Sequence, residues 1–253
     1  MRFARFAIGS TIGYGTVEDD GRIRAITTTP FLPWEPTDEY FDSSQVRLLA
    51  PVLPSKVCAI GLNYVAHAEE QGKPLPEEPL LFLKPSTSVI GPGEPILLPP
   101  QSERVDHEAE LALVIGRATR NVGAADALDH VLGYTCANDV TARDLQRRDV
   151  QFTRGKGFDT FCPIGPHVVT DLDGDKLEIT CRVNGEVRQS SSTSDMVFKV
   201  AELIAYISSV MTLLPGDVIL TGTPSGISPL HDGDNVEIEL EGIGVLANPV
   251  RLA

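Results

Sequence analysis

The chain contains 253 residues, carries a formal net charge of −14 and is 42% hydrophobic. Its length suits one large domain or a small domain followed by a large one, and its apolar content suffices for a full core. An acidic chain with only 21 lysines and arginines and no basic cluster is not expected to bind nucleic acid or an anionic membrane.

The first 50 residues predict a small β-rich domain. Residues 1–26 alternate in the manner of strands, with a turn at 19–21, and they hold no apolar segment of the length of a signal peptide. A turn-rich stretch follows, and Pro51 and Pro54 indicate a linker or an edge strand. We therefore expect a small domain over residues 1–50 and a larger one over residues 51–253.

The larger region alternates strands with a few helices. A core strand is predicted from residue 56, and Asn63 then suits the N-cap of a two-turn helix that stops at Gly72. Helices are also predicted over 121–133, with Gly133 at the end, over 141–149 and, from amphipathic spacing, over 197–207. The other segments are strand-like, with a hairpin at Asn184–Gly185. This mixture predicts an α+β, mainly β, sandwich-like fold.

Several classes of site are not expected in this chain. There is no stretch of about 18 apolar residues, so no transmembrane helix is predicted. Neither a glycine-rich phosphate loop nor an H-E-x-x-H motif occurs, which argues against nucleotide and zinc sites. The cysteines lack C-x-x-C spacing and have mostly apolar neighbours, so we expect buried free thiols in a cytoplasmic protein. They are Cys58, Cys136, Cys162 and Cys181.

One apolar strand begins with two acids. In "VDHEAELALVIG", residues 105–116, the run from Leu111 to Ile115 suits a strand buried on both faces. Glu108 and Glu110 lead into this run and point the same way, because side chains alternate along a strand. Two like charges at that spacing repel by about 2–3 kcal/mol at an effective dielectric constant of about 20, and burial adds a desolvation cost.

A divalent cation would remove this repulsion. A third acid, Asp139, ends another predicted strand just before a helix. Because all the ligands would be oxygen atoms, Mg²⁺, Mn²⁺ or Ca²⁺ is favoured over zinc. The pattern also permits an exposed acidic edge strand, since Asp106 shares the parity of Glu108 and Glu110 and has no assigned role.

Two further groups could carry polar chemistry. His67 and Glu70 lie three residues apart on a predicted helix, where a carboxylate can orient an imidazole as a general base. A surface pair of no function would have the same spacing. Lys156 lies between two glycines, which suits a loop whose backbone approaches a ligand, or simply a solvated loop.

Six sequence blocks occur in an order that resembles the fumarylacetoacetate hydrolase family over roughly residues 55–250. The first 50 residues are similar to the short N-terminal region of its bacterial and mitochondrial members. The blocks are "GLNYVAHAEEQG", "LFLKPSTSVIGPGEPILLP", "VDHEAELALVIG", "GYTCANDVTARDLQ", "RGKGFDTFCPIGP" and "PGDVILTGTPSGI".

The resemblance implies a mixed β-sandwich roll, usually a homodimer, that binds Mg²⁺ or Mn²⁺ and a small oxo acid. By motif match, Glu108, Glu110 and Asp139 would be the metal ligands, and Ca²⁺ could replace the native ion in a crystal. Lys156 matches the active-site lysine of the family.

The same resemblance assigns the remaining site residues. His67 and Glu70 match an acid–base pair on a helix that closes over the site. Arg143, Gln146 and Thr223 match positions that contact the substrate.

The matched residues imply a hydrolase that cleaves a carbon–carbon bond in 2,4-dioxo acids, such as fumarylpyruvate or acetylpyruvate, through an enolate. Hydrolysis is favoured because His67, Glu70 and Lys156 are all present. The runners-up are an isomerase of 2-hydroxyhepta-2,4-diene-1,7-dioate, a decarboxylase of 5-oxopent-3-ene-1,2,5-tricarboxylate in aromatic catabolism, and an oxaloacetate decarboxylase. A metal-binding scaffold without activity is the alternative outside enzymes.

Overall fold

The computed structural model describes residues 1–253 and is mostly sheet, with few and short helices. The strands are β1 (Arg2–Ile8), β2 (Thr11–Val17), β3 (Ile23–Ile26), β4 (Pro36–Phe41), β5 (Arg47–Leu48), β6 (Val57–Gly61), β7 (Leu80–Lys84), β8 (Val89–Ile90), β9 (Ile96–Leu98), β10 (Val105–Asp106), β11 (Ala109–Ile115), β12 (Val131–Asn138), β13 (Thr141–Ala142), β14 (Cys162–Val169), β15 (Glu178–Val183), β16 (Glu186–Ser192), β17 (Val218–Leu220), β18 (Asn235–Leu240) and β19 (Gly244–Leu252). The α-helices are α1 (Val65–Glu70), α2 (Ala124–Ala127), α3 (Arg143–Arg148), α4 (Thr153–Lys156) and α5 (Val200–Val210).

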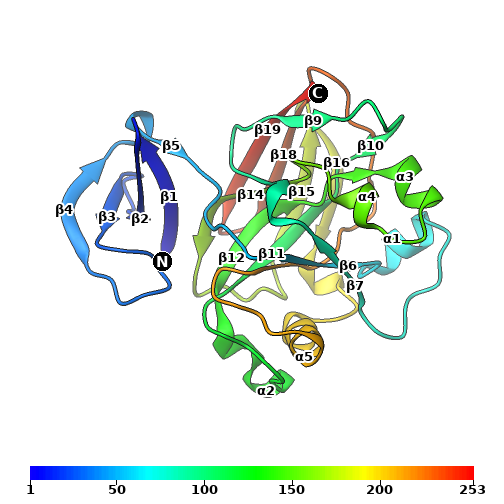
Figure 1. Ribbon diagram of the computed structural model, residues 1–253, viewed down its shortest axis with the longest axis horizontal. Helices are drawn as coiled ribbons and strands as arrows, with labels where there is room; N and C mark the ends of the chain where they lie inside the picture. Colours follow the sequence, from blue (N-terminus) through cyan, green and yellow to red (C-terminus); the bar gives the residue numbers. More distant parts are fainter.

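Two sheets enclose the main core. The larger runs in the order β4-β3-β2-β1-β14-β12-β11-β17-β6-β7, and the smaller in the order β16-β15-β18-β19-β9. Side chains from both, such as Leu111, Leu113, Ile179 and Ile238, belong to one cluster of 35 buried residues. Figure 1 shows α2 and α5 together at one end of this body, and α1, α3 and α4 on another side.

The N-terminal strands β1 to β5 form a lobe at the left of Figure 1. They have a small buried cluster of their own, which includes Phe6 and Ile23. The lobe is continuous with the larger sheet, because Arg2 and Phe3 of β1 pair with Val169 and Val168 of β14. The division at residue 50 stays a prediction.

Strand β11 lies inside the larger sheet and not at its edge. It pairs with β12 on one side and β17 on the other, and all seven of its residues are buried. The predicted buried strand is therefore confirmed. The alternative of an exposed acidic edge is wrong, since Glu108 and Glu110 are only 4% and 1% exposed.

Two helix starts differ from prediction because of one asparagine. Asn63 does not cap α1; its side chain accepts a hydrogen bond from the Phe198 backbone and donates one to the Thr221 carbonyl, both 2.8 Å long. Its own carbonyl accepts from Val197 N–H at 2.8 Å, so α5 begins only at Val200. Side-chain bonds across the fold thus replace a local cap.

The helix predicted over 121–133 is also shorter. It consists of α2 and one 3₁₀ turn, Leu128–His130, after which the chain enters β12. Gly133 lies within β12, where a Cβ would stand 2.5 Å from the carbonyl oxygen of Val169. This glycine therefore permits the close approach of β14 and does not end a helix.

Several local predictions are confirmed. Gly72 follows α1 with φ of 63°, and Asn184 and Gly185 join β15 to β16 with φ of 54° and 81°, as a tight hairpin requires. All four cysteines are buried free thiols. No helix has the length and apolar character needed to cross a bilayer.

Candidate active site

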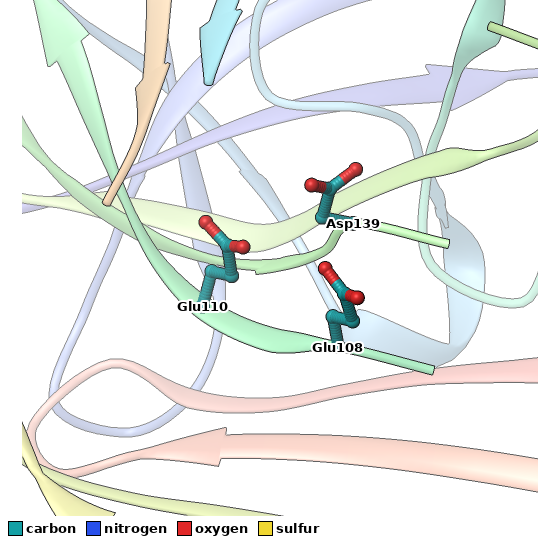
Figure 2. A group of neighbouring side chains, drawn as sticks. All are labelled: Glu108, Glu110 and Asp139. Carbon is teal, nitrogen blue, oxygen red and sulfur yellow. The ribbon is translucent and has the colours of Figure 1, made fainter. Parts of the chain in front are cut away.

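Three carboxylates meet where β11 begins and β12 ends. Glu110 lies on β11, Glu108 directly precedes that strand, and Asp139 directly follows β12. The two strands pair with Ala109 opposite Asn138, and Asp139 N–H donates to the Glu108 carbonyl at 2.9 Å. One oxygen from each carboxylate lies within 4.8 Å of the others. Figure 2 shows the three side chains as close neighbours.

Cations surround two of these acids but not the third. Lys156 Nζ donates to Glu108 Oε2 at 2.7 Å and to Asp139 Oδ2 at 2.5 Å, and Lys84 Nζ donates to Asp139 Oδ1 at 2.6 Å. Glu110 accepts only the Gly222 backbone N–H, at 2.7 Å. Burial and the neighbouring Asp139 carboxylate therefore raise the pKa of Glu110 well above its usual value.

For Glu108 and Lys156, which form an ion pair, the charged neighbours outweigh the effect of burial on the pKa. Burial alone would raise the pKa of Glu108, but Lys156 and Arg143 outweigh it and lower that pKa. Burial alone would lower the pKa of Lys156, but Asp139 and Glu108 raise it, so the lysine stays charged.

This donor set fits a hard divalent cation. The three converging side chains offer only oxygen atoms, which Mg²⁺ and Mn²⁺ prefer. Glu110 supplies a buried carboxylate that no side-chain cation contacts, so an ion in the cluster would compensate its charge. The predicted ligand residues are thus brought together, and ion binding stays a prediction.

Lys156 does not lie in a loop, contrary to prediction. It is the last residue of α4, and its ammonium is buried among the acids. A Cβ on Gly155 would stand 3.0 Å from Gln146 Cα, so this glycine lets α4 pack against α3. A Cβ on Gly157 would stand 2.5 Å from the Thr153 carbonyl oxygen. Both glycines therefore serve backbone packing that buries the lysine.

Asp106, which had no role in the sequence, orients Arg143. Its fully buried carboxylate accepts from Arg143 Nε at 2.9 Å and from Arg104 Nε at 2.8 Å. Arg143 then donates through Nη1 to Gln146 Oε1 at 2.7 Å and through Nη2 to Glu108. The short pairing of β10 with β13 places Asp106 beside the start of α3.

We expect Asp106→Ala to lower the free energy of unfolding by about 3 kcal/mol, because the buried guanidinium of Arg143 keeps Glu108 but loses the charged acceptor of its Nε. Arg104→Gln is the matched control: its side chain is 43% exposed, so we expect a loss of no more than about 1 kcal/mol. Urea unfolding measures both. Equal losses for the two variants would contradict a buried Asp106–Arg143 pair.

Helix α1 carries the predicted acid–base pair. His67 is buried, and its Nδ1 lies 3.0 Å from Glu70 Oε2. The carboxylate places the ring proton on Nδ1 and leaves the Nε2 lone pair free to accept a proton. Glu70 also accepts the Gly226 N–H through Oε1, at 2.9 Å, which ties α1 to the segment after β17.

One pocket collects the predicted site residues. It contains all of them except Glu70, which contacts His67. Its apolar walls include Ile60, Phe82 and Phe152, and it also includes Lys73, an exposed cation without an ion pair. The predicted residues in its lining are His67, Glu108, Glu110, Asp139, Arg143, Gln146, Lys156 and Thr223.

Sequence reasoning missed other members of the site. Lys84 carried a usable signal, because a lysine inside the apolar run "LLFLK" requires a buried partner. Gln189 of β16 hydrogen-bonds to Thr223 at 2.8 Å, but its strand shows no pattern that points to the site.

The family assignment comes from comparison with known proteins. The protein-family model described as fumarylacetoacetate (FAA) hydrolase C-terminal matches residues 56–251. A second family model, described as Rv2993c-like, N-terminal, matches residues 1–51. The human mitochondrial protein named oxaloacetate tautomerase FAHD2B is 49% identical over 234 residues, which cover 87% of this chain and 72% of the human protein.

Solved structures agree over the whole chain. The 5-carboxymethyl-2-hydroxymuconate delta-isomerase of Mycobacterium smegmatis is 50% identical with a TM-score of 0.94, and each chain is fully covered. The maleylpyruvate hydrolase of Sphingobium sp. SYK-6, solved with manganese(II) and pyruvate, is 33% identical with a TM-score of 0.83, again with both chains fully covered. This protein therefore belongs to the fumarylacetoacetate hydrolase family of enzymes.

Proposed function

We propose that this protein transfers a proton at the carbon beside the ketone of a 2-oxo dicarboxylic acid, and so interconverts keto and enol forms or shifts a conjugated double bond. The observation that carries the proposal is one pocket in which an acid–base histidine, a buried lysine and three converging carboxylates meet. The relatives about half identical in sequence are named as a tautomerase and an isomerase, which favours proton transfer.

A divalent cation held by Glu108, Glu110 and Asp139 would supply Lewis-acid character and a template for the carboxylate and ketone oxygens of the oxo acid. We infer Mg²⁺ or Mn²⁺ from the oxygen ligands and from the manganese(II) in the Sphingobium enzyme. A metal-binding scaffold without turnover is disfavoured, because His67 lies in the same pocket.

Each side chain of the pocket has a separate role in the proposed proton transfer. His67, oriented by Glu70, takes the proton from the carbon beside the ketone through Nε2, and the electron pair moves onto the ketone oxygen. Lys156 stabilises the negative charge of the resulting enolate. The proton then returns to the oxygen, giving the enol, or to a distal carbon of a conjugated chain, giving the shifted double bond. Gln146, whose Oε1 accepts from Arg143, is free to donate through Nε2 to a substrate carboxylate.

The pocket suits a second carboxylate on the substrate. Lys156 and Arg143 already contact acids of the protein, whereas Lys73 forms no ion pair. A distal carboxylate would therefore find a free cation in Lys73. This supports dicarboxylic substrates over monocarboxylic ones.

Hydrolysis of acylpyruvates is the second candidate, and the Sphingobium maleylpyruvate hydrolase favours it. His67 would then take a proton from water, and the hydroxide would add to the C4 carbonyl. The C3–C4 bond would break to release a carboxylic acid and the enolate of pyruvate, which is protonated to pyruvate. Both candidates share the enolate, so the residues alone support both.

We expect a substrate panel with Mg²⁺ or Mn²⁺ to show faster keto–enol exchange of oxaloacetate and isomerisation of 2-hydroxyhepta-2,4-diene-1,7-dioate than cleavage of acetylpyruvate or fumarylpyruvate. Ultraviolet absorbance follows all four reactions. EDTA is expected to remove the activity and re-added metal to restore it. Fast cleavage without proton exchange would favour the hydrolase, and metal binding without any turnover would favour the scaffold.

A further inference from the structure

A buried glutamine joins the two sheets at the back of the pocket. Gln189 of β16 is 1% exposed and reaches across to the segment after β17. Its Nε2 donates to Thr223 Oγ1 and to the Pro224 carbonyl, both at 2.8 Å. Its Oε1 accepts from Ala109 N–H at 3.0 Å, in the strand that carries Glu110.

Two backbone groups establish which way this amide points. The Ala109 N–H can only donate, so the atom that faces it is the oxygen, and the Pro224 carbonyl can only accept, so its partner is the NH₂ group. Oε1 also faces His107 Nδ1 at 3.0 Å, which therefore donates. All four hydrogen-bonding positions of the amide are occupied, and a flip would set its oxygen against the Pro224 carbonyl and its NH₂ group against Ala109 N–H.

The amide orientation determines the direction of the Thr223 hydroxyl. Because Gln189 Nε2 donates to one of the two lone pairs of Thr223 Oγ1, the hydroxyl hydrogen cannot point toward Gln189 and is free to bond elsewhere. No acceptor of the protein bonds to that hydrogen, although Thr223 is only 2% exposed and lines the pocket. The preceding residue, Gly222, bonds to Glu110 Oε2, so the hydroxyl lies beside the carboxylate cluster.

We propose that Gln189 is a positioning residue that makes Thr223 a hydrogen-bond donor to an oxygen of the bound oxo acid. This inference rests on the proposed function for the ligand in the pocket. The ligand atom that accepts this hydrogen bond is then a carboxylate, ketone or enolate oxygen. Thr223 thereby favours the ionised form of the ligand.

A double-mutant cycle on the Mn²⁺-loaded protein tests the proposal, with oxalate, an acceptor-only mimic of the enolate, as the probe in calorimetry. Thr223→Val is expected to weaken oxalate binding about tenfold, the usual scale for a lost hydrogen bond to a charged group. Gln189→Glu offers acceptors where the amide offered donors, so the Thr223 hydroxyl turns toward it and the loss is similar. Thr223→Ser keeps the hydroxyl and should bind within about twofold of wild type.

The cycle distinguishes a change in the direction of the Thr223 hydroxyl from a folding defect and from the added charge of Gln189→Glu. In the Thr223→Val background, Gln189→Glu is expected to add less than about threefold, because the hydroxyl it would turn is already gone. Losses that multiply in the double variant would overturn the proposal, since a structural defect or the repulsion of a new charge persists without Thr223. If Gln189→Glu does not fold, Gln189→Met replaces it: methionine donates nothing to Thr223, so the hydroxyl loses its fixed direction and the same non-additivity is expected. Oxalate binding without turnover of any oxo acid would reject the proposed function while still deciding this inference.

Discussion

Glu110→Gln is expected to weaken Mn²⁺ binding by more than about 100-fold and to abolish turnover, while the chain stays folded. Loss of residues that only support a ligand already costs about 10–100-fold in metal affinity, so loss of a ligand costs more. Glu110 is the best acid to change because no cation contacts it. The neutral amide relieves repulsion with Asp139, so the metal-free variant should be at least as stable as wild type.

Electron paramagnetic resonance of bound Mn²⁺ and thermal unfolding with and without metal measure this prediction. Glu103→Gln is the matched control, since Glu103 is an exposed acid on the same segment. Glu108→Ala is a weaker test, because it removes one buried partner from both Lys156 and Arg143 and endangers the fold. Wild-type Mn²⁺ affinity in Glu110→Gln would contradict the carboxylate site.

His67→Asn is expected to lower kcat by about 10²–10⁴-fold, the usual contribution of a general acid–base group, with Mn²⁺ affinity unchanged. Glu70→Gln should have a smaller effect, because Glu70 orients the imidazole from behind and also accepts a backbone N–H from Gly226. Steady-state kinetics on the best substrate of the panel, beside a Mn²⁺ titration, separates loss of the base from loss of the metal.

The chain offers a close control for this prediction. His231 and Asp234 have the same three-residue spacing, with Nδ1 and Oδ2 3.6 Å apart, but the histidine side chain is 74% exposed and lies outside the pocket. His231→Asn should leave kcat unchanged. If His67→Asn keeps wild-type kcat on every substrate, His67 is not the base, and the proton transfer belongs to another group.

Two of the three clustered carboxylates could be singled out from the sequence because their signal is local. Glu108 and Glu110 lead directly into an apolar run whose pattern already required burial, so the conflict between charge and burial was visible within 12 residues. The pair His67 and Glu70 followed from helical spacing in the same way. Their meeting with Asp139 and Lys156 was available only through family resemblance, because the distances between separate strands and helices depend on pairing.

The sequence by itself predicted the buried strand β11, the free thiols and the hairpin at Asn184–Gly185, and it marked Glu108 and Glu110 as candidate ligands. Only the tertiary structure decided that Asp106 pairs with Arg143, that Lys84 pairs with Asp139 and that Gln189 hydrogen-bonds to Thr223. The tertiary structure also shows that the Asn63 side chain, predicted to cap a helix, instead hydrogen-bonds to Phe198 and Thr221. The reason is physical: alternation and capping act between near neighbours, whereas the partner of a buried polar group is chosen by whichever strand packs against it.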